Sequence, residues 1–218
     1  MLRSRASALL LVAAALVSAP GLAYAELVGD PEAAAQYWGR QHYDDCTMMA
    51  VADVVGQITG AKPTEDELIA LAAATPNGEG SGPIYSLPTD EAEGTAARKL
   101  QLPNIRDLPV LLERYGIGSV YTNDAVAADG GLPTGIPALE EDLAVGKKVI
   151  ASVNGETIWD TPGDRSVHNH ALVVTGIDPE AGIVHLNDSA SPHPDSQVSI
   201  DTFEAAWLTS DHAIVVAG

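Results

Sequence analysis

The spacing of the apolar residues changes along the chain, and this change constrains the fold more than any other feature. In the first half, apolar residues recur at helical spacing, as in the stretch 46–58. In the second half, the short apolar runs 171–177 and 183–186 are rich in β-branched residues and flank a turn at 178–182. Helices followed by strands predict an α+β fold, in which a helical lobe packs on an antiparallel sheet.

Caps and turn residues place the other elements. Thr64 and Glu67 form a capping box, which predicts a helix at 64–74, and Asn104 is suited to cap a second helix at 105–115. The other helices are expected at 95–101, 136–145 and 202–207, and the other strands at 119–122, 148–153, 197–200 and 212–216. Long loops are expected at 75–94, 123–135 and 155–169. Long ordered loops in a compact domain are often functional.

The first 25 residues have the pattern of a secretory signal peptide. Arg3 and Arg5 supply the positive start, the apolar run 8–17 is too short to span a bilayer, and a small-residue cleavage site ends at Ala25. Residues 26–218 have the length of a single domain, without a second run of membrane length. We therefore expect a protein that is secreted or lies at the cell-envelope exterior, without an integral membrane segment.

The chain is strongly acidic. Thirty Asp and Glu residues against eleven Lys and Arg give a formal net charge of −19, and loss of the signal segment would make the charge more negative. Such a charge argues against binding to nucleic acid or to anionic membrane surfaces, and it favours solubility. The expected partner is a peptide or protein substrate, and the expected oligomeric state is a monomer.

Cys46 is the only cysteine among 218 residues, so it cannot form an intramolecular disulfide. Exported proteins usually pair their cysteines, which makes a lone thiol unusual. Cys46 begins the predicted helix 46–58, where the positive end of the helix dipole favours a thiolate. It is therefore either a small buried core residue or a catalytic nucleophile. Gln41, five residues earlier, carries an amide that could donate to a developing oxyanion.

A thiol nucleophile needs a basic partner, and the six histidines supply the candidates. His168 and His170 stand at the start of the most apolar strand, where a sheet could aim a side chain at a cleft. Antiparallel pairing around the turn at 178–182 places the residues near 188–190 opposite His170. Asp188 could then hold the imidazole tautomer, and Asn187 could do so without a charge. In the alternative interpretation, His170 is an ordinary strand histidine and the Asn-Asp pair belongs to a turn.

Several segments together resemble one peptidase family. The strings 170–178 and 184–188 are similar to the His and Asp segments of papain-like bacterial peptidases, typified by the bacteriocin-processing, double-glycine leader peptidases and their secreted relatives. The segment 136–150 resembles the helix and strand that precede the His in that family, and 203–207 resembles its terminal Phe-x-x-x-Trp helix. The resemblance spans roughly residues 36–217. It preserves the chain order of four residues: Gln41, Cys46, His170 and Asp188.

The resemblance implies a papain-like fold and a cysteine hydrolase that cleaves a peptide or isopeptide amide. Cys46 would attack the carbonyl, His170 would shuttle the proton, and Asp188 would orient His170. Gln41 and the backbone amide of Cys46 would stabilise the oxyanion. This chemistry needs neither a metal nor another cofactor.

Two departures from the family pattern are visible. Thr47 stands where most members have Gly, and the Gln-to-Cys spacing is one residue shorter than usual, so Gln36 or a backbone amide is an alternative oxyanion donor. Asp44 and Asp45 also place two carboxylates beside the thiol, which opposes ionisation of the thiol unless solvent screens them.

Two other functions stay open. The pair Asp45-Cys46 resembles the Asp-Cys pair of NlpC-type cell-wall endopeptidases, although the Ser-Gly that follows in that family is missing. A non-catalytic exported binding module with the same fold is the other possibility. In that module Cys46 would be buried with no imidazole in reach.

Overall fold

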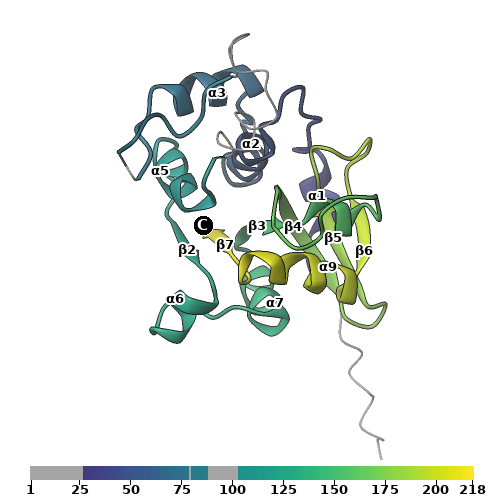
Figure 1. The fold of residues 1–218 in the computed structure, drawn as a ribbon. Helices are drawn as coiled ribbons and strands as arrows, with labels where there is room; N and C mark the ends of the chain where they lie inside the picture. Colours follow the sequence, from purple (N-terminus) through teal and green to yellow (C-terminus); the bar gives the residue numbers. More distant parts are fainter. Residues whose placement is uncertain (1–26, 79, 88–102) are drawn as a thin grey trace, which may run out of the picture.

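The computed structural model describes residues 27–78, 80–87 and 103–218 (Figure 1). The predicted signal peptide at 1–25 and the predicted helix at 95–101 lie outside the described residues. Within the described ranges, no helix is long and apolar enough to cross a membrane.

One antiparallel sheet forms the centre of the structure. Its strands follow the order β2-β7-β3-β4-β5-β6, and β1 pairs with β4 beside this path. The strands are β1 (Val28–Gly29), β2 (Ser119–Thr122), β3 (Lys148–Val153), β4 (His170–Asp178), β5 (Ile183–Asn187), β6 (Ser196–Ser199) and β7 (Ile214–Ala217). Each strand expected from the sequence is present to within two residues, and the predicted α+β class is confirmed.

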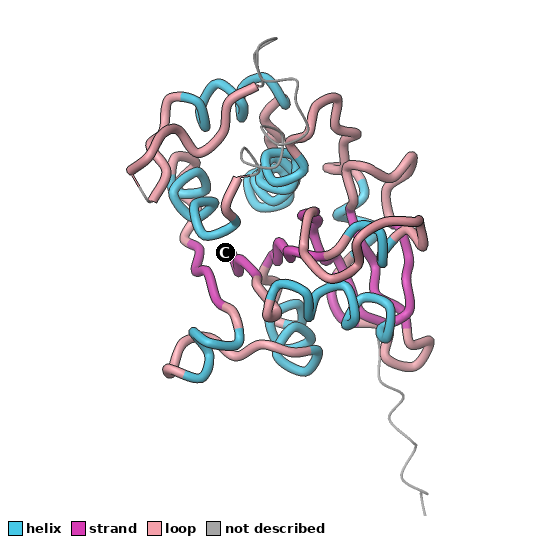
Figure 2. The backbone as a smooth tube through the Cα atoms, viewed as in Figure 1, coloured by secondary structure: helices cyan, strands magenta, loops and turns pink. Residues whose placement is uncertain are grey.

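The N-terminal helices cover one face of this sheet, as Figures 1 and 2 show. They are α1 (Pro31–Ala35), α2 (Cys46–Thr59), α3 (Glu65–Ala73) and, after a 3-10 turn at Ile105–Asp107, α5 (Leu108–Glu113). Their core with the sheet includes Met48, Val51, Leu68, Leu111, Ile150, Val173 and Val215. Every residue of α2 from Cys46 to Gly56 is buried, so this helix is a fixed central element.

A second helical layer covers the opposite face. It consists of α7 (Ile136–Ala144) and α9 (Ile200–Trp207), and its core includes Leu139, Phe203, Trp207, Val149, Leu172 and Val174. Successive residues of β3 and β4 belong to opposite cores because strand side chains alternate between the two faces of a sheet. The sheet is therefore buried on both sides, which explains the continuous apolar runs in its central strands.

Local sequence signals account for the ends of the main helices. The capping box of α3 is present, because Thr64 Oγ1 accepts from the Glu67 amide at 3.2 Å while Glu67 Oε2 accepts from the Thr64 amide at 2.8 Å. Gly60 ends α2 in the left-handed region with φ of 77°.

Two short helices lie within segments that the sequence predicts to be loops. They are α6 (Asp124–Ala128) and α8 (Gly155–Ile158), and the loop predictions at 123–135 and 155–169 are wrong over these residues. Both helices are capped by asparagine: Asn123 Oδ1 accepts from the Val126 amide and Asn154 Oδ1 from the Thr157 amide. Helices of four or five residues are too short to produce a recognisable apolar period.

A β-bulge interrupts the pairing of β4 with β5. Val174 and Gly176 pair with consecutive residues of β5, which leaves Thr175 as the extra residue. The strand β1 approaches β4 very closely at this point. A Cβ atom on Gly29, whose φ is +86°, would lie 2.3 Å from the carbonyl oxygen of Thr175, so only glycine fits there.

Candidate active site

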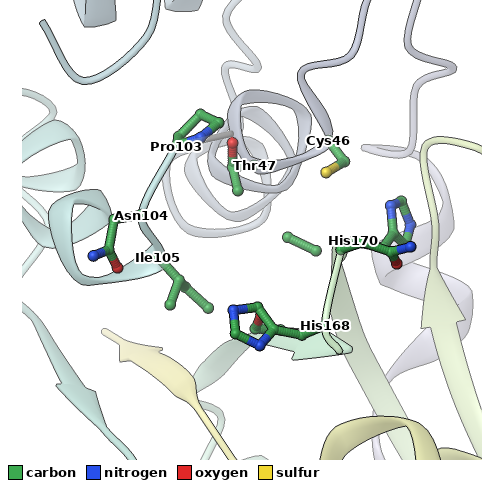
Figure 3. Close-up of a pocket in the computed structure, with 10 residues that line it drawn as sticks. Cys46, Thr47, Pro103, Asn104, Ile105, His168 and His170 are labelled. Carbon is green, nitrogen blue, oxygen red and sulfur yellow. The ribbon is translucent and has the colours of Figure 1, made fainter. Parts of the chain in front are cut away.

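Cys46 is the first residue of α2 and is 6% exposed. Asp45 precedes it as the N-cap residue, and the loop before the helix is polar. The amides of the first helical turn and the helix dipole together give this end of α2 a positive potential. The sulfur therefore lies where a negative charge is favoured, at the edge of a pocket that Figure 3 shows.

His170 is the first residue of β4 and is 7% exposed. Its Nε2 atom lies 2.8 Å from Asp188 Oδ1, and its ring lines the same pocket as the Cys46 side chain, with which it interacts electrostatically. Because Nε2 is engaged by the carboxylate, Nδ1 is the nitrogen that faces the thiol. The imidazole thus lies between the sulfur and the carboxylate, as the predicted roles require.

Asp188 directly follows β5 and is completely buried. Its carboxylate accepts hydrogen bonds from His170 Nε2, from Trp159 Nε1 at 2.8 Å and from the Ala190 amide at 2.9 Å. Burial alone would raise the pKa of Asp188, but these three donors outweigh burial and lower it. The carboxylate is consequently ionised next to His170.

The protonated form of His170 is strongly favoured. Burial lowers its pKa, but the charge and hydrogen bond of Cys46 and the hydrogen bond of Asp188 outweigh burial and raise the pKa to about 10. The attraction to Cys46 exists only when the sulfur is negative. His170 is therefore protonated at neutral pH.

Two tryptophans complete the surroundings of Asp188. The Trp159 ring lies 4.8 Å from the His170 ring at an interplanar angle of 60°, and Trp38 Nε1 donates to the Asp188 carbonyl oxygen at 2.7 Å. The sequence analysis did not single out Trp159. An indole in the otherwise polar segment 155–169 is the signal that could have identified it.

Gln41 occupies a different environment from the one its predicted role suggests. Its Nε2 atom donates to the Tyr43 carbonyl oxygen at 2.8 Å, and its Oε1 atom accepts from Ser189 Oγ at 2.7 Å. It lines a neighbouring polar pocket of about 350 Å³ between the loop before α2 and the loop after β5. In this conformation one amide hydrogen is committed to Tyr43, and the oxyanion role of Gln41 stays a prediction.

A pocket of about 360 Å³ opens beside the thiol, between α2, residues 103–105 at the start of the 3-10 turn, and the start of β4 (Figure 3). It is lined by Cys46, Thr47, Pro103, Asn104, Ile105, Ser152, His168, Asn169, His170 and Ala171. The lining mixes polar and apolar side chains. His168 lines the pocket, and its Nδ1 atom lies 3.3 Å from the Thr209 carbonyl oxygen.

An acidic cluster lies on the other side of the Cys46 backbone. Asp45 is fully buried, and neither carboxylate oxygen has a hydrogen-bond partner of ordinary geometry within the described parts of the chain. Burial and the nearby Glu65 carboxylate raise the pKa of Asp45 to about 7. Glu65 Oε2 in turn lies 2.5 Å from His42 Nδ1, and this contact raises the pKa of His42.

The titration of Asp45 predicts a specific pH dependence of stability. Its folded-state pKa is raised above the ordinary value of 3.8, so the folded protein binds the proton more tightly than the unfolded chain. Stability is therefore expected to fall as the pH rises through 7. Between pH 5 and 8, the melting temperature of Asp45→Asn should fall by about 2–4 °C less than that of the wild type. This difference corresponds to roughly 1 kcal/mol in the free energy of unfolding.

Thermal melts in a pH series test this expectation. Asp44→Asn is the matched control, since Asp44 is the exposed neighbour of Asp45. Parallel pH curves for the wild type and Asp45→Asn would show that Asp45 does not titrate in this range.

Two further histidines are engaged with carboxylates away from the thiol. His185 Nδ1 lies 2.7 Å from Asp195 Oδ1, and His212 bridges Asp124 and Glu204. None of the described residues form a group of three or more metal-binding side chains.

Comparisons with known proteins place the chain in a family. No profile of a known protein family matches it. The chain is 42% identical over 212 residues to the uncharacterized protein Rv1268c of Mycobacterium tuberculosis and to the uncharacterized protein Mb1299c of Mycobacterium bovis. Each alignment covers 94% of this chain and 90% of the relative.

One solved structure supports the fold. A protein of Bacillus anthracis, provisionally described as a C39-like peptidase, has a TM-score of 0.60 at 17% identity, over 88% of this chain and 98% of that chain. A double glycine motif protease from an AMS/PCAT transporter, solved with the leader peptide, is more distant, with a TM-score of 0.47 and 11% identity over 82% and 87%. The chain therefore belongs to the same family as the two mycobacterial proteins and has the papain-like fold of C39-type peptidases.

Proposed function

We propose that the protein is an exported cysteine hydrolase that cleaves a peptide or isopeptide amide. One observation carries the proposal: the buried imidazole of His170 is hydrogen-bonded to Asp188 and lines the same pocket as the Cys46 side chain, with which it interacts electrostatically. A satisfied core cysteine needs no such partner, whereas a nucleophile needs a base that is itself oriented by a third group.

The reaction follows from this order of contacts. The Cys46 sulfur attacks the amide carbon, and the carbonyl electron pair moves to the oxygen. The His170 imidazolium then gives its proton to the departing nitrogen as the carbon–nitrogen bond breaks, which leaves a thioester on Cys46. His170, now neutral, takes a proton from water, and the resulting hydroxide displaces the thiolate to release the acid.

The oxyanion is stabilised by the backbone amide of Cys46 and by the side-chain amide of Gln41. The first of these lies at the N-terminus of α2, where the helix dipole adds to the effect. Gln41 can contribute through its second amide hydrogen, or by turning away from Tyr43 when substrate binds. The pocket beside Thr47 and Ile105 receives the substrate residues next to the scissile bond.

Peptide-library profiling tests this function directly. Protein that begins at Glu26 is incubated with a mixed peptide library, and new termini are read by mass spectrometry. A parallel sample is treated with iodoacetamide and mapped for alkylation. We expect cleavage of peptide bonds and alkylation of folded protein at Cys46. A thiol that reacts only after unfolding, together with an uncut library, would favour the non-catalytic binding module. Cleavage of purified cell-wall peptides into shorter peptides, with an uncut library, would favour the NlpC-type function.

Export is the other part of the proposal. It is supported by the signal pattern of residues 1–25 and by the acidic composition. Mass spectrometry of the protein recovered from the culture medium or the cell envelope is expected to find Glu26 at the N-terminus. A retained Met1 would mean that this stretch is an anchor and that the protein is held at the membrane.

A further inference from the structure

Asp53 is a buried acid that the proposed reaction does not use. It lies on α2, seven residues after Cys46, which is two helical turns along the same side of the helix. It is 4% exposed, and its two carboxylate oxygens accept from Gln57 Nε2 at 2.5 Å and from Asn187 Nδ2 at 2.9 Å. A buried carboxylate is unfavourable unless it is paired, so its presence in this core calls for a reason.

Asn187 connects Asp53 to the candidate active site. It is the last residue of β5, directly before Asp188, and it is 3% exposed. Its amide nitrogen also donates to the Ala34 carbonyl oxygen at 2.9 Å, and its oxygen accepts from the Asp195 amide at 3.4 Å. The side chain of Asn187 therefore ties the end of β5 to both α1 and α2.

The direction of Asn187 determines the direction of its neighbour. Asn187 pairs with Val173, whose side chain lies in the core shared with α2. Because side chains alternate along a strand, Asp188 then points to the other face, where it meets His170. We propose that Asp53 is a positioning residue, which acts through Asn187 to hold Asp188 in line with His170 and with the helix that carries Cys46.

A carboxylate suits this task better than an amide. Both of its oxygens accept hydrogen bonds, so it can hold Gln57 and Asn187 without a fixed orientation. Burial raises the pKa of Asp53 to about 6, against the opposing effects of its two amide donors and of Lys62 and Lys148. Asp53 is then ionised at neutral pH, and ionic hydrogen bonds are stronger than neutral ones.

The proposal rests on the proposed function only for its kinetic readout. The experiment compares Asp53→Ala and Asp53→Asn with Gln57→Ala, a matched control that removes a hydrogen bond to Asp53 but leaves Asn187 in contact. The ¹⁵N resonances of the His170 ring are titrated by NMR in each variant, and they are assigned by their loss in His170→Gln. Turnover and KM are measured on a peptide taken from the library cleavage.

Asp53→Ala is expected to move the His170 titration to lower pH, because the imidazolium loses a well-placed Asp188. It should lower kcat by on the order of tenfold to a hundredfold with little change in KM. Asp53→Asn should show a smaller effect of the same kind, and Gln57→Ala should behave as the wild type. A wild-type His170 titration in both Asp53 variants would overturn the proposal, as would equal shifts in all three variants.

The NMR arm needs no substrate, so it separates the two failures. If the wild type cleaves nothing, the proposed function fails while the His170 titration still tests the role of Asp53. If Asp53→Ala does not fold, the His170 titration in the isosteric Asp53→Asn variant tests the role of Asp53.

Discussion

Replacing Cys46 with alanine is expected to abolish hydrolysis. The sulfur is the atom that forms the covalent bond, so its removal should lower kcat by on the order of 10⁴-fold or more. Cys46 is small and 6% exposed, so the loss of its sulfur leaves only a small cavity in the protein. The melting temperature should therefore stay within a few degrees of the wild-type value, which circular dichroism can check.

Removal of the base, His170, should lower kcat by a similar factor. His170→Ala would leave the buried Asp188 without its main partner, which is destabilising. The better variant is His170→Gln, because its amide can still donate to that carboxylate. The double variant with Cys46→Ala should have a kcat no lower than that of either single variant, since the two residues act as a unit.

His168→Ala is the matched control for these variants. This second histidine lines the same pocket but contacts the Thr209 carbonyl oxygen. Because His168 lines the substrate pocket, its removal is expected to change KM, while kcat should stay near the wild-type value. Near-native hydrolysis by His170→Gln combined with a large loss in His168→Ala would transfer the role of base to His168.

Asp188→Asn is expected to lower turnover by one to two decades, which corresponds to roughly 1.4–2.8 kcal/mol in barrier. The amide keeps the shape of the carboxylate but removes the negative charge, and one of its two ends can no longer accept from His170 or Trp159. The loss should be smaller than in a serine enzyme, because the thiol can already be ionised beside the imidazolium.

Asp188→Ala should lower turnover further than Asp188→Asn, and it should move the alkaline limb of the pH–rate profile to lower pH. The Asp188 carboxylate helps to raise the pKa of His170, so without it the imidazolium is lost at lower pH. Asp195→Asn is the control, since it changes the half-buried carboxylate of another His–Asp pair, at His185. Unchanged rates and pH profiles in both Asp188 variants would reduce the triad to a dyad.

The sequence alone was sufficient to predict the main parts of the fold. The helical spacing of 46–58, the capping box at Thr64 and the hairpin around 178–182 each depend on neighbouring residues, and local signals of this kind are readable. For the candidate triad, local reasoning supplied only candidates: a lone thiol at a helix start, a His at the start of one strand and an Asp at the end of the next, which the resemblance to a peptidase family then selected. The structure places these three side chains together.

Other parts of the site depend on tertiary contacts and were not predictable. Trp159 meets His170 and Asp188 only because α8, a single helical turn, carries it there. The conformation of Gln41 depends on Ser189, 148 residues away along the chain. Nothing in the sequence near Asp53 indicates that its partner is Asn187. Such pairings over long sequence separations leave no periodic pattern that a sequence analysis can detect.

The extra residue in β4 has a consequence for how this family can vary in length. Thr175 shifts the register by one residue, so Asn187 lies opposite Val173. In an unbulged ladder, Asp188 would take that position, and each residue at the end of β5 would turn to the other face of the sheet. The carboxylate would then point at α2 and the amide at the imidazole. A single deletion within β4 would thus exchange the two side chains without changing either of them. Length changes in the exposed turn at 178–182 can be absorbed outside the ladder. Insertions and deletions among relatives should accordingly collect in that turn and avoid the strand.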